Sequence, residues 1–159
     1  MLLGHFGIGF AGKTLTKEMP LWVLFIAVMI PDLMSLVFSL AGISDEGAFL
    51  SHSLLMTLVF AAFSAVVIFL VFRCLFDVLL FCGLIFTHWI CDWIAWPMEA
   101  IDQYHGISLF VPEKTFGLGL YKTMAGALLC EFLLFFAGMG LYLYSRRRAR
   151  NNEDNPAVK

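Results

Sequence analysis

Charged residues are scarce in this chain of 159 amino acids, because only 14% are Asp, Glu, Lys or Arg. A soluble domain usually carries about 25% charged and about 45–50% apolar residues, whereas 61% of this sequence is apolar and its mean hydropathy is +0.88. This balance excludes a water-soluble globular fold and a disordered chain. The net charge of −2 gives no general attraction to nucleic acid. The composition indicates an integral membrane protein.

Several motifs are also missing from the sequence. It has no CxxC spacing, so the four cysteines do not form a zinc-ribbon or disulfide framework. It has no Gly-x-Ser-x-Gly sequence, which argues against a serine nucleophile. Residues 1–12 lack the basic start and cleavage site of a signal peptide, so we expect them in the mature protein. The cysteines lie within or beside apolar blocks and are expected to be packing thiols: Cys74, Cys82, Cys91 and Cys130.

Long apolar blocks are the main positive feature. They cover residues 20–42, 53–72, 74–96 and 120–144. A helix needs about 20 residues to cross a hydrocarbon core of about 30 Å, and these blocks lack the alternation of barrel strands. The sequence therefore predicts an all-α integral membrane protein with a four-transmembrane-helix bundle. Residues 1–145 would form one domain, and residues 146–159 a basic, then polar, disordered tail.

The first twelve residues are apolar but too short to span a membrane. They contain four closely spaced glycines, which allow close contact between helices. The segment is expected either to lie at the membrane interface or to enter the bundle as a half-helix. The glycines are Gly4, Gly7, Gly9 and Gly12.

Basic residues fall mostly on one side of the four-span arrangement. The positive-inside rule then places both termini in the cytoplasm and the two acidic loops outside. The outer side has only Lys114 and Lys122. The basic residues of the inner side are Lys13, Lys17, Arg73, Arg146, Arg147, Arg148 and Arg150.

The few ionisable groups inside the apolar blocks are candidates for function, because each costs about 2.5–3.5 kcal/mol or more at the membrane centre. They come from separate helices and are expected to converge in the outer half of the bundle. They are Asp32, His52, His88, Asp92 and Glu131.

The chemistry of this set favours a metal site. His88 and Asp92 are four residues apart and so share one face of a helix. His52 and Asp32 offer two more ligands, and mixed imidazole and carboxylate ligands suit zinc, or alternatively iron or manganese. The alternative is polar packing without an ion. The metal is preferred because buried carboxylates need positive compensation, and Pro31 frees backbone groups beside Asp32.

Other polar residues have structural interpretations. Ser51 is expected to cap the second long helix, and Asp77 to pair with Arg73 at i, i+4. The tryptophans of the third block fit an interfacial aromatic belt. The outer loop offers further acids and a histidine that would line the mouth of the site or be solvated: Glu99, Asp102 and His105.

The order of these motifs resembles that of the YdjM-like proteins, a family of membrane-bound, metal-dependent hydrolases of the bacterial inner membrane. The shared pieces are His5, Pro31-Asp32, Ser51-His52-Ser53, His88-x-x-x-Asp92 and the stretch from Gly106 to Phe110-Val111-Pro112, and they cover roughly residues 1–115. Two departures are Gly4, where members often have Thr, and Gly47-Ala48, where many have His-Arg. The second departure would remove a substrate-binding cation or an additional ligand.

The resemblance implies a metal centre formed by His5, Asp32, His52, His88 and Asp92. His5 reaches such a centre only if the N-terminal segment inserts as a half-helix. The leading hypothesis is a metal-dependent hydrolase that acts on a lipid or lipid-linked ester or phosphoester. Glu131 and Asp92 are the candidate catalytic residues, and Asp32 is a further candidate base.

The alternative function is a small proton- or cation-coupled transporter or channel subunit that uses the same Asp, His and Glu residues. Four spans are few for a monomeric carrier, so this version predicts a homo-oligomer. No inverted repeat supports it.

Overall fold

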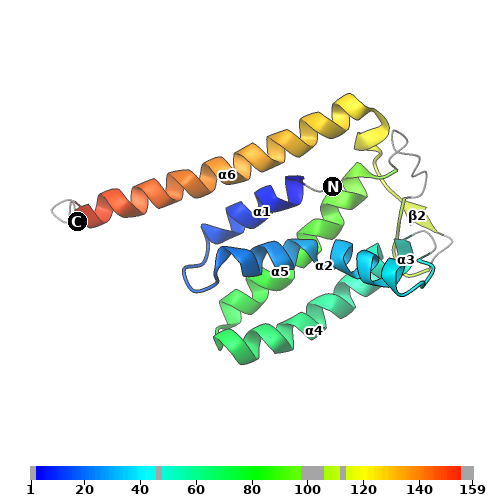
Figure 1. The fold of residues 1–159 in the computed structure, drawn as a ribbon, viewed down its shortest axis with the longest axis horizontal. Helices are drawn as coiled ribbons and strands as arrows, with labels where there is room; N and C mark the ends of the chain where they lie inside the picture. The colour runs from blue at the N-terminus through cyan, green and yellow to red at the C-terminus, as the bar shows by residue number, and fades with distance from the viewer. Residues whose placement is uncertain (1–2, 46–47, 98–105, 112–113, 155–159) are drawn as a thin grey trace.

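The computed structural model describes residues 3–45, 48–97, 106–111 and 114–154, and these are mostly helical (Figure 1). Within them, four helices are long and apolar enough to cross a membrane. The predicted all-α, four-span architecture is therefore confirmed. The four helices are α2 (Leu21–Leu40), α4 (Leu54–Phe72), α5 (Leu75–Ala95) and α6 (Met124–Asp154).

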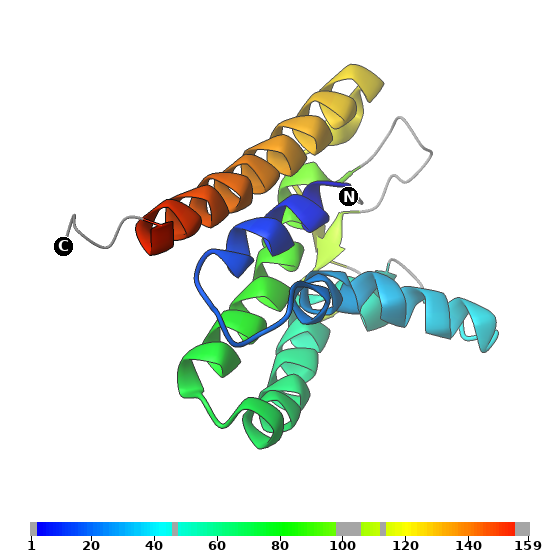
Figure 2. The same cartoon turned by 60° about the vertical axis from the view of Figure 1, so that its left-hand side comes forward.

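The glycine-rich N-terminus forms a short helix, α1 (Leu3–Lys13). This agrees with the expectation of a half-helix that enters the bundle. Helix α1 lies alongside α6 and runs in the same direction (Figures 1 and 2). A Cβ atom at Gly7 would collide with the backbone of Leu134, and one at Gly138 would collide with the Gly7 carbonyl. The two backbones can approach this closely only because both positions lack a side chain.

Helix α5 is the central element of the bundle. It forms a hairpin with α4, and the turn between them contains Arg73 at a φ of 54°. Its other faces contact α2 and α1. Apolar side chains from α2, α4 and α5 form the main core, which includes Leu24, Val28, Ile68, Phe81 and Ile85. This core lies along the middle of α5. Buried Asp77 lies near the start of the helix, and buried His88 and Asp92 lie near its end.

Short elements close the end of the bundle where α4 begins. The one-turn helix α3 (Phe49–His52) leads directly into α4. Ser53 caps α4, because its Oγ accepts the Met56 N–H at 3.1 Å, so the expectation that Ser51 serves as this cap is wrong. The strands β1 (Ile107–Ser108) and β2 (Thr115–Phe116) pair antiparallel, and Gly106 packs too closely on Phe116 to admit a side chain.

Helix α6 differs from the predicted fourth block at both ends. Residues 120–122 form a separate 3-10 turn, η3 (Leu120–Lys122), and α6 starts later because Thr123 Oγ1 accepts the Gly126 N–H at 3.1 Å. At the other end the helix continues to residue 154 instead of giving way to a disordered tail. Arginine and alanine favour helix, and residues 141–154 contain no glycine or proline to end it. The rest of the tail lies outside the described residues.

Candidate metal centre

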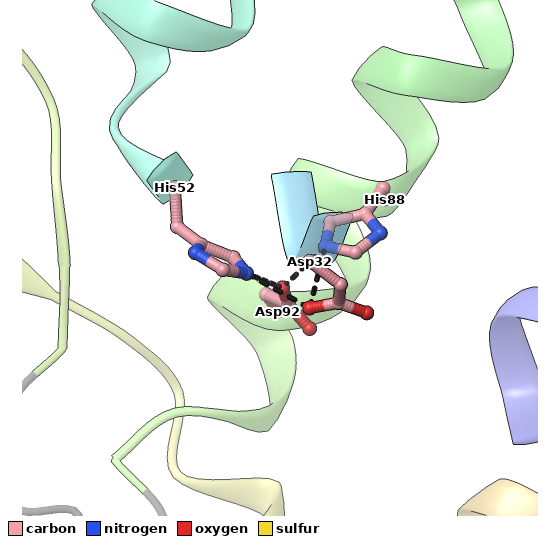
Figure 3. Close-up of side chains that lie close together, drawn as sticks. All are labelled: Asp32, His52, His88 and Asp92. Carbon is pink, nitrogen blue, oxygen red and sulfur yellow. Dashed lines mark hydrogen bonds and ion pairs between the residues drawn. The ribbon is translucent and has the colours of Figure 1, made fainter. Parts of the chain in front are cut away.

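Four of the predicted ligands converge at one point, although they come from three helices (Figure 3). Asp32 lies on α2 beyond Pro31, His52 ends α3, and His88 and Asp92 lie one turn apart on α5. One ligand atom from each residue lies within 4.8 Å of the other three. His88 and Asp92 are almost fully buried, whereas the Asp32 side chain keeps 30% of its surface exposed. This cluster can hold a metal ion.

The distances between the ligand atoms fit one small cation. Asp92 Oδ2 lies 2.9 Å from His88 Nε2 and 3.5 Å from His52 Nε2. Asp32 Oδ1 lies 3.1 Å from His52 Nε2 and 3.8 Å from His88 Nε2. Around a tetrahedral ion with bonds of about 2.0–2.2 Å, neighbouring ligand atoms are separated by about 3.3–3.6 Å. Two of the four separations are shorter than this range, one lies within it and one is longer.

The orientation of His88 is set by the backbone of α2. His88 Nδ1 lies 2.5 Å from the Val28 carbonyl oxygen, which can only accept a hydrogen bond. Nδ1 therefore carries the proton, and the lone pair of the neutral ring is on Nε2. Pro31 interrupts the hydrogen-bond ladder of α2 beside this point because it has no N–H.

The orientation of His52 is set by a chain of two polar side chains. The Ser51 hydroxyl donates to the Asp45 carboxylate, and Ser51 Oγ lies 2.6 Å from His52 Nδ1. Because the single hydroxyl proton is used toward Asp45, Ser51 accepts from His52 Nδ1–H. The lone pair of this ring is therefore also on Nε2. Outer partners of this kind fix the tautomer of metal-binding histidines in many proteins.

Two imidazole lone pairs thus face two carboxylates. Lone pairs repel carboxylate oxygens, so the arrangement requires positive charge between them. This positive charge can be supplied in two ways: by an additional proton on each imidazole, or by one shared cation. A divalent cation also neutralises both carboxylates, which compensates for their burial.

His5 reaches this cluster, as the family resemblance implies. The half-helix α1 places its ring, which is fully buried, in a stack on His88 with 3.8 Å between the ring centroids. His5 Nε2 lies 3.8 Å from Asp92 Oδ1. The structure nevertheless leaves His5 outside the group of four close ligand atoms.

Glu131, the predicted general base, is held by two donors. Its Oε2 accepts the Gly4 N–H at 2.6 Å, and its Oε1 accepts the Tyr121 hydroxyl at 3.1 Å. Burial raises the pKa of Tyr121, and the neighbouring Glu131 carboxylate raises it further, so the hydroxyl remains a donor. A carboxylate at the first turn of α1 also complements the helix dipole. These contacts fix the position of α1, and with it the position of His5.

The sequence did not reveal three groups that orient the histidines, either directly or, for Asp45, through Ser51. They are Asp45, the Val28 carbonyl and Trp96, whose ring stacks on His52 with 5.7 Å between centroids. Trp96 was assigned to an interfacial belt, yet it is buried. The one hint in the sequence is that Ser51 directly precedes His52. Ser51 was interpreted as a helix cap and not as a partner of the histidine.

The remaining polar predictions have mixed outcomes. Asp77 is buried and accepts the Thr16 hydroxyl at 2.8 Å, and no ion pair joins it to Arg73 among the described residues. All four cysteines are free, as predicted. The proposed mouth of the site, Glu99, Asp102 and His105, lies outside the described residues.

Comparison with known proteins adds no assignment to this geometry. No family model, curated protein or solved structure matches the chain.

Proposed function

We propose that this protein is a membrane-embedded, metal-dependent hydrolase that acts on a lipid or lipid-linked ester or phosphoester. The proposal includes membership of the YdjM-like family, which rests on the motif order given above. The observation that carries the proposal is the pair of imidazoles whose Nδ1 protons are held by outer acceptors, so that both Nε2 atoms face Asp32 and Asp92.

Zinc fits the donor set best, since two imidazole nitrogens and two carboxylate oxygens match its usual ligands and separations; iron and manganese remain alternatives. A divalent ion bound here supplies Lewis acidity and lowers the pKa of a coordinated water towards about 7. Asp32 is the exposed member of the cluster, so substrate approaches from its side. If Asp32 were released from the ion, three protein ligands would remain, the open position would take a water, and the free Asp32 carboxylate would be placed to accept its proton.

A lipid substrate is supported by the surroundings of the cluster. An apolar groove of about 310 Å³ lies between α5 and α6, lined by Cys91, Leu134 and their neighbours. Cys91 precedes the ligand Asp92, and Tyr121, which donates to Glu131, also lines the groove. A groove of this kind between two apolar spans suits a hydrocarbon chain.

The arrangement of basic residues supports an orientation in a bacterial inner membrane. Lys13 ends α1, Arg73 follows the last residue of α4, and the arginines lie in the C-terminal half of α6. These helix ends lie at the end of the molecule away from α3, which carries His52 (Figure 1). The positive-inside rule places that end in the cytoplasm. The cluster then lies toward the outer leaflet, where the substrate would be found.

The core of α5 supports the alternative function, a proton or cation carrier, less well than it supports a hydrolase. A proton or cation pathway needs polar groups along the whole span. Between His88 and Asp77 the buried residues of α5 are apolar, and they include Phe81, Leu84 and Ile85. The polar cluster therefore ends inside the bundle, which suits a site of reaction better than a route across it.

The proposal is tested with the full chain in vesicles of phosphatidylethanolamine and phosphatidylglycerol. Zinc-loaded wild type is expected to release water-soluble or deacylated products that mass spectrometry detects, and chelator treatment is expected to abolish this release. His88→Ala is expected to be inactive, because Nε2 is lost. Thr87→Val is the matched control, since the Thr87 hydroxyl bonds only to the Gly83 carbonyl of its own helix and should leave activity unchanged.

The same vesicles also test the alternative. Proton or zinc flux that is lost in His88→Ala, together with no product from zinc-loaded wild type, would contradict the hydrolase and support the carrier.

A further inference from the structure

The two oxygens of Asp92 face different histidines. Oδ2 lies 2.9 Å from His88 Nε2, and Oδ1 lies 3.8 Å from His5 Nε2. All three side chains are almost completely buried. Asp92 therefore has the position of a carboxylate that bridges two ligand groups, because Oδ2 faces the cluster of four and Oδ1 faces His5.

The stacking of the two rings shows why one ion does not serve both histidines. The His5 and His88 rings are nearly parallel, with 19° between their planes and 3.8 Å between their centroids. A metal ion bound by imidazole lies close to the plane of the ring, in the direction of the lone pair. Both Nε2 atoms face the same carboxylate, so an ion bound to each would lie in one of two separate, nearly parallel ring planes. Two such positions are separated by about the stacking distance, and two-metal sites have ions about 3.5–4 Å apart.

We propose that the centre binds two divalent ions, bridged by the Asp92 carboxylate. The first lies among Asp32, His52, His88 and Asp92 Oδ2. The second lies between His5 Nε2 and Asp92 Oδ1. This inference rests on the metal site of the proposed function and adds a second ion to it.

The second position explains features that a single ion does not use. A histidine at the tip of a half-helix is buried next to the cluster, and Glu131 fixes that tip through the Gly4 N–H. The described residues supply two ligands to this ion, against four to the first. The second ion is therefore expected to bind more weakly and to leave first on dialysis, and its other coordination positions are open to water or substrate.

The test uses Mn²⁺ with the full chain, purified in detergent and stripped of metal with a chelator. Equilibrium dialysis is expected to show two Mn²⁺ per wild-type chain at saturation, with a spin-coupled electron paramagnetic resonance spectrum. His5→Phe keeps an aromatic ring on His88 but has no nitrogen to bind an ion. It is expected to bind one Mn²⁺ with unchanged affinity and an uncoupled spectrum.

The other outcomes separate the two proposals. Saturation of the wild type at one Mn²⁺ would overturn the second ion and leave the metal site intact. Two coupled ions in His5→Phe would also overturn it, because the second ion would then not need His5. No ion at all in that variant would overturn it as well, because the first ion would then depend on His5. No Mn²⁺, zinc or iron bound to the wild type would overturn the metal site itself.

Discussion

Helix α5 buries one carboxylate near each of its ends, and the two differ sharply in their surroundings. Asp77 is 2% exposed and accepts one hydroxyl, from Thr16, in the linker that follows α1. Asp92 is 1% exposed and faces the nitrogens of His5, His52 and His88. The half-helix α1 connects the two ends, because His5 lies near its start and Thr16 follows its end.

Burial alone does not distinguish a site from a structural contact. Asp77 is as well buried as Asp92, but among the described residues its carboxylate accepts only the Thr16 hydroxyl, and no donor reaches its Oδ2 atom. At Asp92, histidine nitrogens from α1, α3 and α5 gather around two carboxylates, and the Nδ1 protons of His52 and His88 point outward. The convergence of ligands with lone pairs directed inward is what indicates a metal centre.

The largest expected difference between the two ends is in metal binding. Asp92→Asn removes a charged ligand and should weaken zinc binding by more than the about 10–100-fold that loss of an outer partner costs. Asp77→Asn is the matched variant on the same helix, and its zinc affinity should equal that of the wild type. Isothermal titration of metal-stripped protein measures both. Equal losses of zinc affinity in the two variants would contradict the difference described between the Asp77 and Asp92 ends of α5.

The second comparison is between two serines that flank His52. Ser51→Ala removes the acceptor of His52 Nδ1–H and should lower zinc affinity by about 10–100-fold. Ser53→Ala removes the cap of α4 and should cost about 0.5–2 kcal/mol of stability while zinc affinity is retained. Competition with a fluorescent zinc chelator separates the two effects. Unchanged affinity in Ser51→Ala would contradict the role given to the Asp45–Ser51–His52 chain.

A third comparison concerns the packing of the half-helix that joins the two ends. Gly7→Ala forces a methyl group into the backbone of α6 and should destabilise the protein by about 1–3 kcal/mol. At Gly140, also on α6, no atom lies within 4 Å of an added Cβ, so Gly140→Ala should stabilise the helix by about 0.5–1 kcal/mol. Thermal unfolding in detergent, followed by circular dichroism, is the measurement. Equal stability of the two variants would argue against close contact between α1 and α6.

The last comparison concerns the Asp77 end, where stability should change and zinc affinity should not. Thr16→Val leaves the buried Asp77 without its hydroxyl donor and should cost about 1–3 kcal/mol. Thr14→Val is the control, because Thr14 is exposed and its hydroxyl bonds only to the Ala11 carbonyl, so it should have little effect. Unfolding temperatures in detergent compare the two. A change in zinc affinity of Thr16→Val without a change in stability would show that the Asp77 end belongs to the metal site.

Much of this arrangement could be predicted from the sequence, since apolar blocks of membrane-spanning length constrain the fold strongly. The four spans and the convergence of Asp32, His52, His88 and Asp92 followed from block length and from the depth of each residue. The spacing of His88 and Asp92 alone placed both on one face of α5.

The contacts that orient these ligands could not be predicted in the same way. The Val28 carbonyl is a backbone group, and its availability to His88 depends on how α2 packs against α5. Asp45 reaches Ser51 through the geometry of a loop, which has no periodicity to reveal it. The contact of Glu131 with the Gly4 N–H depends on glycine packing between two parallel helices, so a residue predicted to act as a base is found holding α1 in place.

Elemental analysis of the full chain purified from cells is the most direct test of the central claim. We expect at least one divalent ion per wild-type chain, retained through dialysis, and none in a His52→Ala, His88→Ala double variant that still unfolds cooperatively. Wild-type protein that holds no divalent ion, before or after incubation with zinc, iron or manganese, would rule out the metal centre.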